Sequence, residues 1–179
     1  ALVREIDKNI PAVFLNSTIE FPETVKYVHN MSRLAKLELI HLFPEHDFFD
    51  LCSRLGPPSC FMPWCCQTQK FSTLSRFINH YNPNGILSVE GLRRLESKQR
   101  MNYKRVSINK AIPRKVTVCP IINWTTFEVW LYILWKRIPV NPLYERGFKR
   151  VGCWVCPHKS SSDFRLTELL ARFPLRLCK

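Results

Sequence analysis

The stretch "AVFLNSTIEFPETVKYVHNMSRLAKLELIHL", residues 12–42, decides the fold class of this chain. A short apolar run at 12–16 is followed by apolar residues at helical spacing in 21–36 and by a second apolar run at 37–42. Pro22 suits the first turn of the helix that this spacing predicts. A buried strand, an amphipathic helix and a second strand form a βαβ unit, whose strands lie parallel with a right-handed crossover.

Further elements extend the same alternation. Apolar runs predict strands at 86–90 and 115–121, and a final helix is expected near 163–173. Thr125 and Glu128 have the spacing of a capping box, so a helix is expected in 123–138, and its apolar composition predicts that it is mostly buried. With no repeat or clear linker, residues 1–179 are predicted to form one α/β domain with an open, mostly parallel sheet flanked by helices.

Composition limits the class of protein. The chain has 179 residues, of which 46% are hydrophobic and 12% aromatic, as in folded globular domains. No apolar run approaches the roughly 18 residues of a membrane-spanning helix. The first residues lack a signal-peptide layout and do not include an initiating Met. We therefore expect a cytoplasmic protein without a membrane segment, and a chain that is part of a longer gene product.

The formal net charge of +13 predicts an anionic partner. Between residues 93 and 115 the only acid is Glu96, whereas nine residues are basic: Arg93, Arg94, Lys98, Arg100, Lys104, Arg105, Lys110, Arg114 and Lys115. Such a run can be a solvated basic face, a site for a phosphate- or sulfate-bearing ligand, or a nucleic-acid contact. Tyr103 is its only aromatic residue, which favours the small anion over nucleic acid.

In open α/β sheets, ligands bind beyond the carboxyl ends of the strands. Residues 16–24 and 90–100 follow predicted strands and are therefore candidate ligand loops. The second loop carries Arg93 and Arg94, whose planar guanidinium groups suit bidentate binding of an oxyanion. Read alone, this segment is equally consistent with the start of a surface helix.

The chain has eight cysteines, two of which, Cys65 and Cys66, are adjacent. The pair could be buried apolar residues, a strained disulfide or half of a metal site. Cys153 and Cys156 form a CxxC motif, which is typical of metal chelation and also of redox dithiols. Four thiolates suit structural zinc or an iron–sulfur cluster. Adjacent cysteines chelate one small ion poorly, so we favour a [4Fe–4S] cluster over zinc.

The remaining cysteines are assigned by position. Cys52, Cys60 and Cys119 are expected to be structural. Cys178 is close to the end of the chain and next to Lys179. A terminal thiol near cations is more acidic and more nucleophilic than an ordinary one, although an incidental cysteine is an alternative interpretation.

Several segments together resemble one family, the phosphoadenylyl-sulfate (PAPS) and adenylyl-sulfate (APS) reductases of the PP-loop ATP-pyrophosphatase superfamily. The resemblance covers about residues 12–160 and is carried by "VFLNSTIEFPET", "WCCQTQKFSTL", "GLRRLESKQR", "CPIINWTTFEVWLYI" and "VNPLYERGFKRVGCWVC". It implies an adenine-nucleotide α-hydrolase-like fold with a Cys-rich C-terminal segment at 150–179. It also implies a reductase that releases sulfite from a sulfated adenine nucleotide.

The resemblance implies a role for each matching residue. Cys65, Cys66, Cys153 and Cys156 would hold the [4Fe–4S] cluster, and Lys70 would lie between the cluster and the sulfate. The expected substrate-binding residues are Asn16, Ser17, Thr18, Glu20, Phe21, Glu23, Thr24, Gly91, Arg93, Arg94, Ser97 and Arg100. Cys178 would attack the sulfate sulfur, and a thioredoxin-like or other thiol donor would release sulfite. A homo-oligomer is also expected.

The chain departs from the family pattern in three places. The Ser-Gly-Gly-Lys-Asp-Ser phosphate loop is absent from it, the family Asp and Gly of the first ligand loop are Asn16 and Thr18, and the C-terminal Glu-Cys-Gly-x-His is replaced by "RLCK" around Cys178. Two alternatives therefore stay open. One is a PP-loop sulfur transferase for nucleic-acid thiolation or DNA phosphorothioation, and the other is a zinc-stapled nucleic-acid-binding module.

Overall fold

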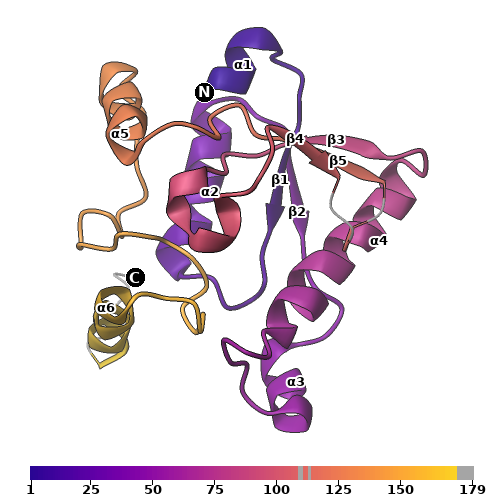
Figure 1. Ribbon diagram of the computed structural model, residues 1–179, viewed down its shortest axis with the longest axis vertical. Coiled ribbons are helices and arrows are strands. Elements are labelled where there is room, and N and C mark those ends of the chain that lie inside the picture. Colours follow the sequence, from indigo (N-terminus) through magenta and orange to yellow (C-terminus); the bar gives the residue numbers. More distant parts are fainter. Residues whose placement is uncertain (109–110, 113, 173–179) are drawn as a thin grey trace.

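The computed structural model describes residues 1–108, 111–112 and 114–172. The chain begins with the short helix α1 (Leu2–Ile6) and continues through strand β1 (Ala12–Leu15), helix α2 (Pro22–Leu34) and strand β2 (Leu39–Leu42). β1 and β2 are parallel, with Ala12 beside Leu39 and Leu15 beside Leu42. The βαβ unit predicted from the sequence is therefore confirmed (Figure 1).

β1 is less buried than predicted. Val13 is exposed, and the other residues of the strand are half-buried. The prediction of a buried strand assumed neighbours on both sides, whereas β1 pairs only with β2 in the part of the chain that the structure describes.

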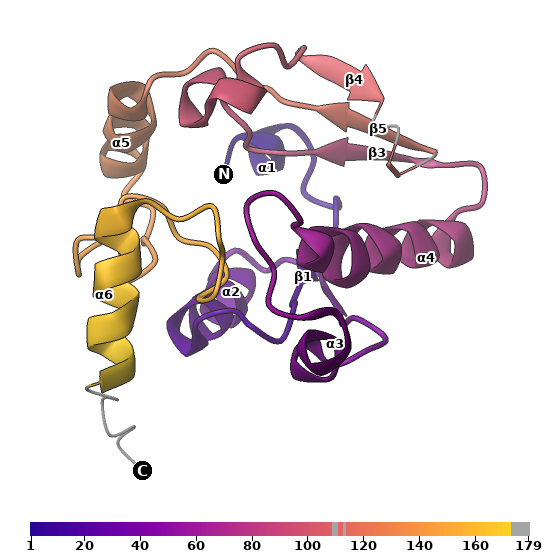
Figure 2. The same cartoon turned by 60° about the horizontal axis from the view of Figure 1, so that its bottom comes forward.

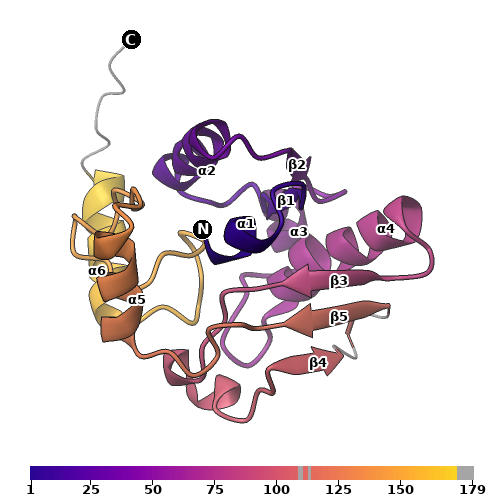
Figure 3. The same cartoon turned by 90° about the horizontal axis from the view of Figure 1, so that it is seen from above.

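A second group contains three strands. β3 (Ile86–Val89) is parallel to β5 (Lys115–Val118), and β4 (Val106–Ile108) is antiparallel to β5 on the other side. Figure 3 shows the β3–β5–β4 group set apart from the β1–β2 pair. The α/β class and the parallel pairing are confirmed. β4 was not predicted, because three residues inside a basic run give too short an alternation to recognise.

Helices connect the two groups of strands. α3 (Phe48–Leu55) follows β2, and a π-helical turn, Cys66–Phe71, continues directly into α4 (Ser72–Tyr81), which leads to β3. Asp47 caps α3 by accepting hydrogen bonds from the backbone N–H groups of Phe49 and Asp50. The tandem cysteines therefore lie at the entrance of a helix, and Lys70 lies within the π-helical turn.

The last two helices, α5 (Thr126–Trp135) and α6 (Ser161–Arg172), lie at one end of the molecule (Figures 1 and 2). The predicted capping box of α5 is present, with Thr125 and Glu128 bonding each other's backbone N–H. The prediction that α5 is mostly buried is wrong: Phe127 is 74% exposed, Leu134 71% and Trp135 72%. A helix at the periphery packs against the molecule with only one face, and the other faces of α5 are apolar as well.

The core consists of two small clusters that pack beside the cysteines. One contains Ile19, Phe48, Trp64 and Cys153, and the other contains Phe21, Leu143 and Phe148. Both clusters join the loop after β1 to the C-terminal third of the chain. Within the described ranges, no helix combines the length and apolar character that a membrane crossing requires.

Candidate thiol and anion site

The loop that follows β1 forms one wall of the site. Asn16 accepts a hydrogen bond on Oδ1 from the backbone N–H of Thr18 at 3.0 Å, which closes a tight turn. Thr18 has φ +63°, in the left-handed region that glycine adopts without strain. The turn buries the side chains of Ser17 and Ile19 while Thr18 stays exposed. Thr18 therefore adopts the backbone conformation that suits the family glycine at this position, at a conformational cost.

The CxxC motif packs directly against this loop. The backbone N–H of Trp154 donates to the carbonyl of Ile19 at 3.0 Å, and that of Cys156 donates to the carbonyl of Cys153 at 3.1 Å. Cys153 is only 7% exposed and belongs to the same core cluster as Ile19. Two segments more than 130 residues apart are thereby joined by a backbone contact.

The structure brings the four predicted thiols together. Burial, together with the nearby Cys66, Cys153 and Cys156, raises the pKa of the Cys65 thiol to about 11. All seven described cysteines are free thiols, so the disulfide interpretation of Cys65 and Cys66 is wrong. A group of close thiols whose thiolates repel one another suits a cation or a cationic cluster core, which removes the repulsion.

The thiols can be compared with the usual ligands of an iron–sulfur cluster in number and type. In the described ranges, no group of three or more His, Cys, Asp and Glu side chains is arranged to hold one metal ion. Four thiols, of which Cys65 is in electrostatic contact with the other three, match a [4Fe–4S] cluster in ligand number and type. The nature of the bound group stays a prediction.

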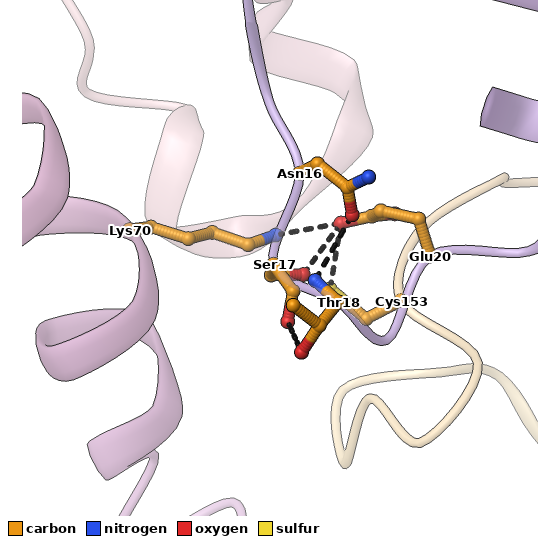
Figure 4. A network of polar contacts seen from close by, with 6 residues as sticks. All are labelled: Asn16, Ser17, Thr18, Glu20, Lys70 and Cys153. Atoms are coloured by element: carbon orange, nitrogen blue, oxygen red, sulfur yellow. Dashed lines mark hydrogen bonds and ion pairs between the residues drawn. The ribbon is translucent and has the colours of Figure 1, made fainter. Parts of the chain in front are cut away.

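A polar network surrounds the Cys153 thiol (Figure 4). The Ser17 hydroxyl donates to Oε1 of Glu20 at 2.7 Å, and the Cys153 Sγ lies 3.4 Å from the same oxygen. Ser17 Oγ and Cys153 Sγ are 3.5 Å apart. Lys70 Nζ approaches Glu20 Oε1 from the other side, at 3.9 Å. One carboxylate oxygen therefore lies between a hydroxyl, a thiol and an ammonium group.

The charges in this network are interdependent. Burial raises the pKa of Cys153, and the ammonium group of Lys70 opposes that shift. For Lys70, burial lowers the pKa, but the Cys153 and Glu20 side chains outweigh it, so the pKa is above its usual value. Lys70 therefore carries a positive charge at neutral pH, as an anion-binding lysine requires.

The loop after β3 supplies a second group of cations. The guanidinium groups of Arg93 and Arg100 both pair with the carboxylate of Glu96, and the Arg93 Nε to Oε1 distance is 3.3 Å. Arg93 also donates to Thr126 Oγ1 at 3.2 Å, which ties the loop to the start of α5. The Ser97 hydroxyl accepts from the backbone N–H of Arg100 at 3.4 Å. Glu96 thus holds two of the predicted arginines side by side.

Arg94 is directed elsewhere. Its Nε donates to the carbonyl of Tyr103 at 3.0 Å and its Nη1 donates to Asn123 Oδ1 at 2.5 Å. These contacts give Arg94 a role in holding the loop. Gly91, which begins the loop, lies against Ile121.

The other predicted ligand residues of the first loop make internal contacts. Glu23 pairs with Arg146 Nη1 at 2.6 Å, and Thr24 Oγ1 accepts from Asn141 at 3.0 Å. Phe21 is buried and packs edge-to-face on Phe148. These residues attach the loop to residues 141–148. The predicted nucleophile Cys178 lies outside the described residues.

Lys159 is a feature that the sequence prediction missed. Its Nζ donates to the carbonyl of Trp154 at 3.0 Å and to Thr167 Oγ1 at 2.6 Å, and it lies 4.5 Å from the centre of the Phe21 ring. Burial lowers its pKa. It attaches the CxxC turn to α6. Its place three residues after Cys156 was the available signal, but a lysine there reads equally well as a surface residue.

Taken together, the parallel strands, the loops at their carboxyl ends and the thiol and cation groups define an α/β domain of the nucleotide-binding type. A family profile described as "Phosphoadenosine phosphosulfate reductase domain" matches residues 1–159, and the chain belongs to this family.

Two relatives are similar to this chain over most of its length. An uncharacterized protein of Methanocaldococcus jannaschii is 34% identical over 172 residues, which cover 96% of this chain and 35% of that protein. The adenosine 5′-phosphosulfate reductase of Shouchella clausii is 29% identical over 158 residues, which cover 87% of this chain and 64% of the enzyme. The chain thus spans about a third of the first relative and less than two thirds of the second.

Solved structures share the fold. The phosphoadenylyl-sulfate reductase of Candida auris, in a phosphate complex, has a TM-score of 0.66 at 17% identity, over 86% of this chain and 73% of that one. The FMN adenylyltransferase of Candida glabrata has a TM-score of 0.63 at 17% identity, over 85% of this chain and 45% of that one.

Proposed function

We propose that this domain binds adenylyl sulfate (adenosine 5′-phosphosulfate) or its 3′-phosphorylated form and reduces the sulfate group to sulfite with a thiol donor. The observation that carries the proposal is the position of Lys70, whose ammonium group lies beside a buried thiol of a four-cysteine group. The family assignment and the name of the Shouchella clausii relative support the same reaction class.

The cations are suited to binding and activating such a substrate. Arg93 and Arg100 offer two planar guanidinium groups, which match the oxygens of a phosphate or sulfate. Lys70 adds a point charge on the side of the thiols. Cations at both ends of the phosphosulfate would stabilise the charge that develops on the leaving nucleotide.

Cys65, Cys66, Cys153 and Cys156 would hold a [4Fe–4S] cluster. When bound, the cluster would supply a compact charged and redox-capable centre next to the substrate. Lys70 is carried on the same π-helical turn as Cys66, so the chain fixes its position relative to the thiol group.

Reduction would use the Cys178 thiol and a donor that carries two thiols. The Cys178 thiolate would attack the sulfate sulfur, forming a sulfur–sulfur bond as the bond to the nucleotide phosphate oxygen breaks and the nucleoside phosphate leaves. A thiol of a thioredoxin-like donor would then attack the Cys178 sulfur and release sulfite. The donor's second thiol would resolve the mixed disulfide, so a dithiol supplies the two electrons.

The test is sulfite release by anaerobically purified protein supplied with a dithiol donor and either nucleotide. We expect sulfite from one of them, and a loss of at least about tenfold in rate for Lys70→Met, because a transition-state charge contact is removed. Lys26→Met, an exposed change in α2, serves as the matched control.

If the wild type binds both nucleotides but forms no sulfite in the presence of the dithiol donor, the proposed reductase activity is refuted. Sulfur transfer to nucleic acid by the same protein would then identify it as a sulfur transferase.

A further inference from the structure

The Glu20 carboxylate forms an ion pair with Lys70, with its Oε1 3.9 Å from the Lys70 Nζ. The Glu20 side chain is 8% exposed, whereas that of Lys70 is 36% exposed. A buried carboxylate beside a buried thiol is unfavourable unless other groups stabilise it. Ser17 and Lys70 provide that stabilisation through the same carboxylate oxygen (Figure 4).

Ser17 and Lys70 hold Glu20 unequally. The hydrogen bond from Ser17 is short, at 2.7 Å, and Ser17 is fully buried. The ion pair with Lys70 is long, at 3.9 Å. Coulomb attraction between unit charges falls with distance, and solvent around the partly exposed Lys70 side chain screens this ion pair further. Glu20 is therefore fixed to its own loop, whereas the ammonium group of Lys70 is the movable partner.

We propose that Glu20 is an internal competitor for Lys70, holding its ammonium group until the sulfate end of the substrate replaces the carboxylate. This inference rests on the proposed function, because it concerns the same lysine and the same class of ligand. Glu20 acts through Lys70 and is a positioning residue that sets the affinity for anions. A ligand carrying two negative charges would displace the carboxylate more readily than a singly charged one, since it gains more from the ammonium group.

The competition predicts a specific pattern of affinities. Glu20→Gln keeps the size of the side chain and an oxygen that accepts from Ser17, but removes the charge that holds Lys70. Adenylyl sulfate and inorganic sulfate should both bind about tenfold more tightly to this variant. Glu38→Gln, an exposed change outside the network, should leave both affinities unchanged.

A double-mutant cycle separates competition from general charge repulsion. Dissociation constants would be measured by calorimetry for wild type, Glu20→Gln, Lys70→Met and the double variant, with adenylyl sulfate and with inorganic sulfate. The tightening caused by Glu20→Gln should largely disappear in the Lys70→Met background. An equal tightening in both backgrounds would overturn the inference, because Glu20 would then repel the ligand directly.

The two proposals fail differently. If inorganic sulfate shows the coupled pattern but neither sulfated nucleotide binds, the competition stands and the proposed function fails. If the nucleotides bind and are reduced but Glu20→Gln leaves both affinities unchanged, the competition is overturned and the proposed function stands. Absence of binding by any anion to any variant would overturn both.

Discussion

Thr18 shows how a single residue adapts the first ligand loop. A β-branched residue at φ +63° is strained by about 1–2 kcal/mol relative to glycine. We predict that Thr18→Gly raises the free energy of unfolding by about 0.5–1 kcal/mol, because part of the relieved strain is offset by the greater freedom of glycine in the unfolded chain. Urea unfolding measures this change. Thr18→Ala keeps the Cβ and should give no stabilisation; equal stabilisation by both variants would contradict the strain argument.

The arginines of the second loop should divide into two classes. Arg93 and Arg100 share Glu96, whereas Arg94 bonds Tyr103 and Asn123. We predict that Arg100→Gln weakens binding of adenylyl sulfate by about tenfold, through loss of a bidentate charge-assisted contact.

Arg94→Gln is the matched variant. It should leave that affinity nearly unchanged and instead lower stability by about 1 kcal/mol, since it loses loop hydrogen bonds. Calorimetric binding and thermal unfolding of the two variants separate these outcomes. A larger affinity loss for Arg94→Gln than for Arg100→Gln would show that the arginines have the opposite roles.

At the residue scale, motifs with chemical meaning could be recognised from the sequence. The four cysteines and Lys70 were identified from spacing and family resemblance, and the structure places them together. The internal role of Glu20 could not be predicted, because it depends on Cys153, which lies 133 residues further along the chain. Sequence patterns report local periodicity and do not report which distant side chains share one oxygen atom.

Among the helices, α5 depends most clearly on a local signal. Thr125 accepts from the backbone N–H of Glu128, and the Glu128 carboxylate accepts in return. Because α5 has no fully buried residue, tertiary packing compensates little for loss of the cap. We predict that Thr125→Ala lowers the free energy of unfolding by about 1 kcal/mol, measured by urea unfolding. Thr125→Ser keeps the hydroxyl and should cost much less; an equal loss for Ala and Ser would exclude capping as the cause.

Helices and strands could be predicted where local spacing or capping determines them. The prediction failed where contacts with distant parts of the chain determine the structure. The helix over 21–36 and the capping box of α5 were recognised, since they rest on local spacing and capping chemistry. The π-helical turn Cys66–Phe71 was not predicted, because nothing in "CQTQKF" distinguishes a π turn from an α-helical one. The burial of α5 was mispredicted, because composition cannot show how many neighbours a helix has.

An exposed apolar surface lies on the β3–β5–β4 group. In register, Leu87, Val116 and Ile108 form one row, and Val89, Val118 and Val106 form the next. The rows share one face, on which the residues of the outer strands β3 and β4 are exposed. On the other face, Lys115 and Thr117 of β5 are buried. Contiguous aliphatic surface of this kind favours association.

We therefore predict that the chain self-associates with increasing concentration, in keeping with the homo-oligomer expected from the sequence. The double variant Leu87→Lys and Ile108→Lys should shift the chain toward monomer, because charges on the face cannot be buried against a second copy. Sedimentation measures the distribution. The pair Leu34→Lys and Leu55→Lys, on exposed helix positions elsewhere, is the control. An unchanged oligomer in the first variant would place the association elsewhere.

At the scale of the whole molecule, the sequence predicted the α/β class and the parallel β1–α2–β2 unit correctly, because alternation of strand and helix fixes the parallel connection. It did not predict that the described strands form two groups. The grouping depends on which strand edges meet, and short apolar runs do not encode that pairing. The site residues could nevertheless be predicted, because the loops after β1 and β3 and the CxxC turn each contain a recognisable sequence motif.

The central claim is that the cysteine pairs 65–66 and 153–156 form one cluster-binding site. The most direct test is the iron and acid-labile sulfide content of anaerobically purified protein, for wild type and for Ser variants in each pair. We expect a brown wild type with about four iron and about four sulfide per chain, and loss of both in Cys66→Ser and in Cys153→Ser, with Cys60→Ser unaffected. A colourless protein with about one zinc per chain, or iron content that depends on only one of the two pairs, would contradict this claim.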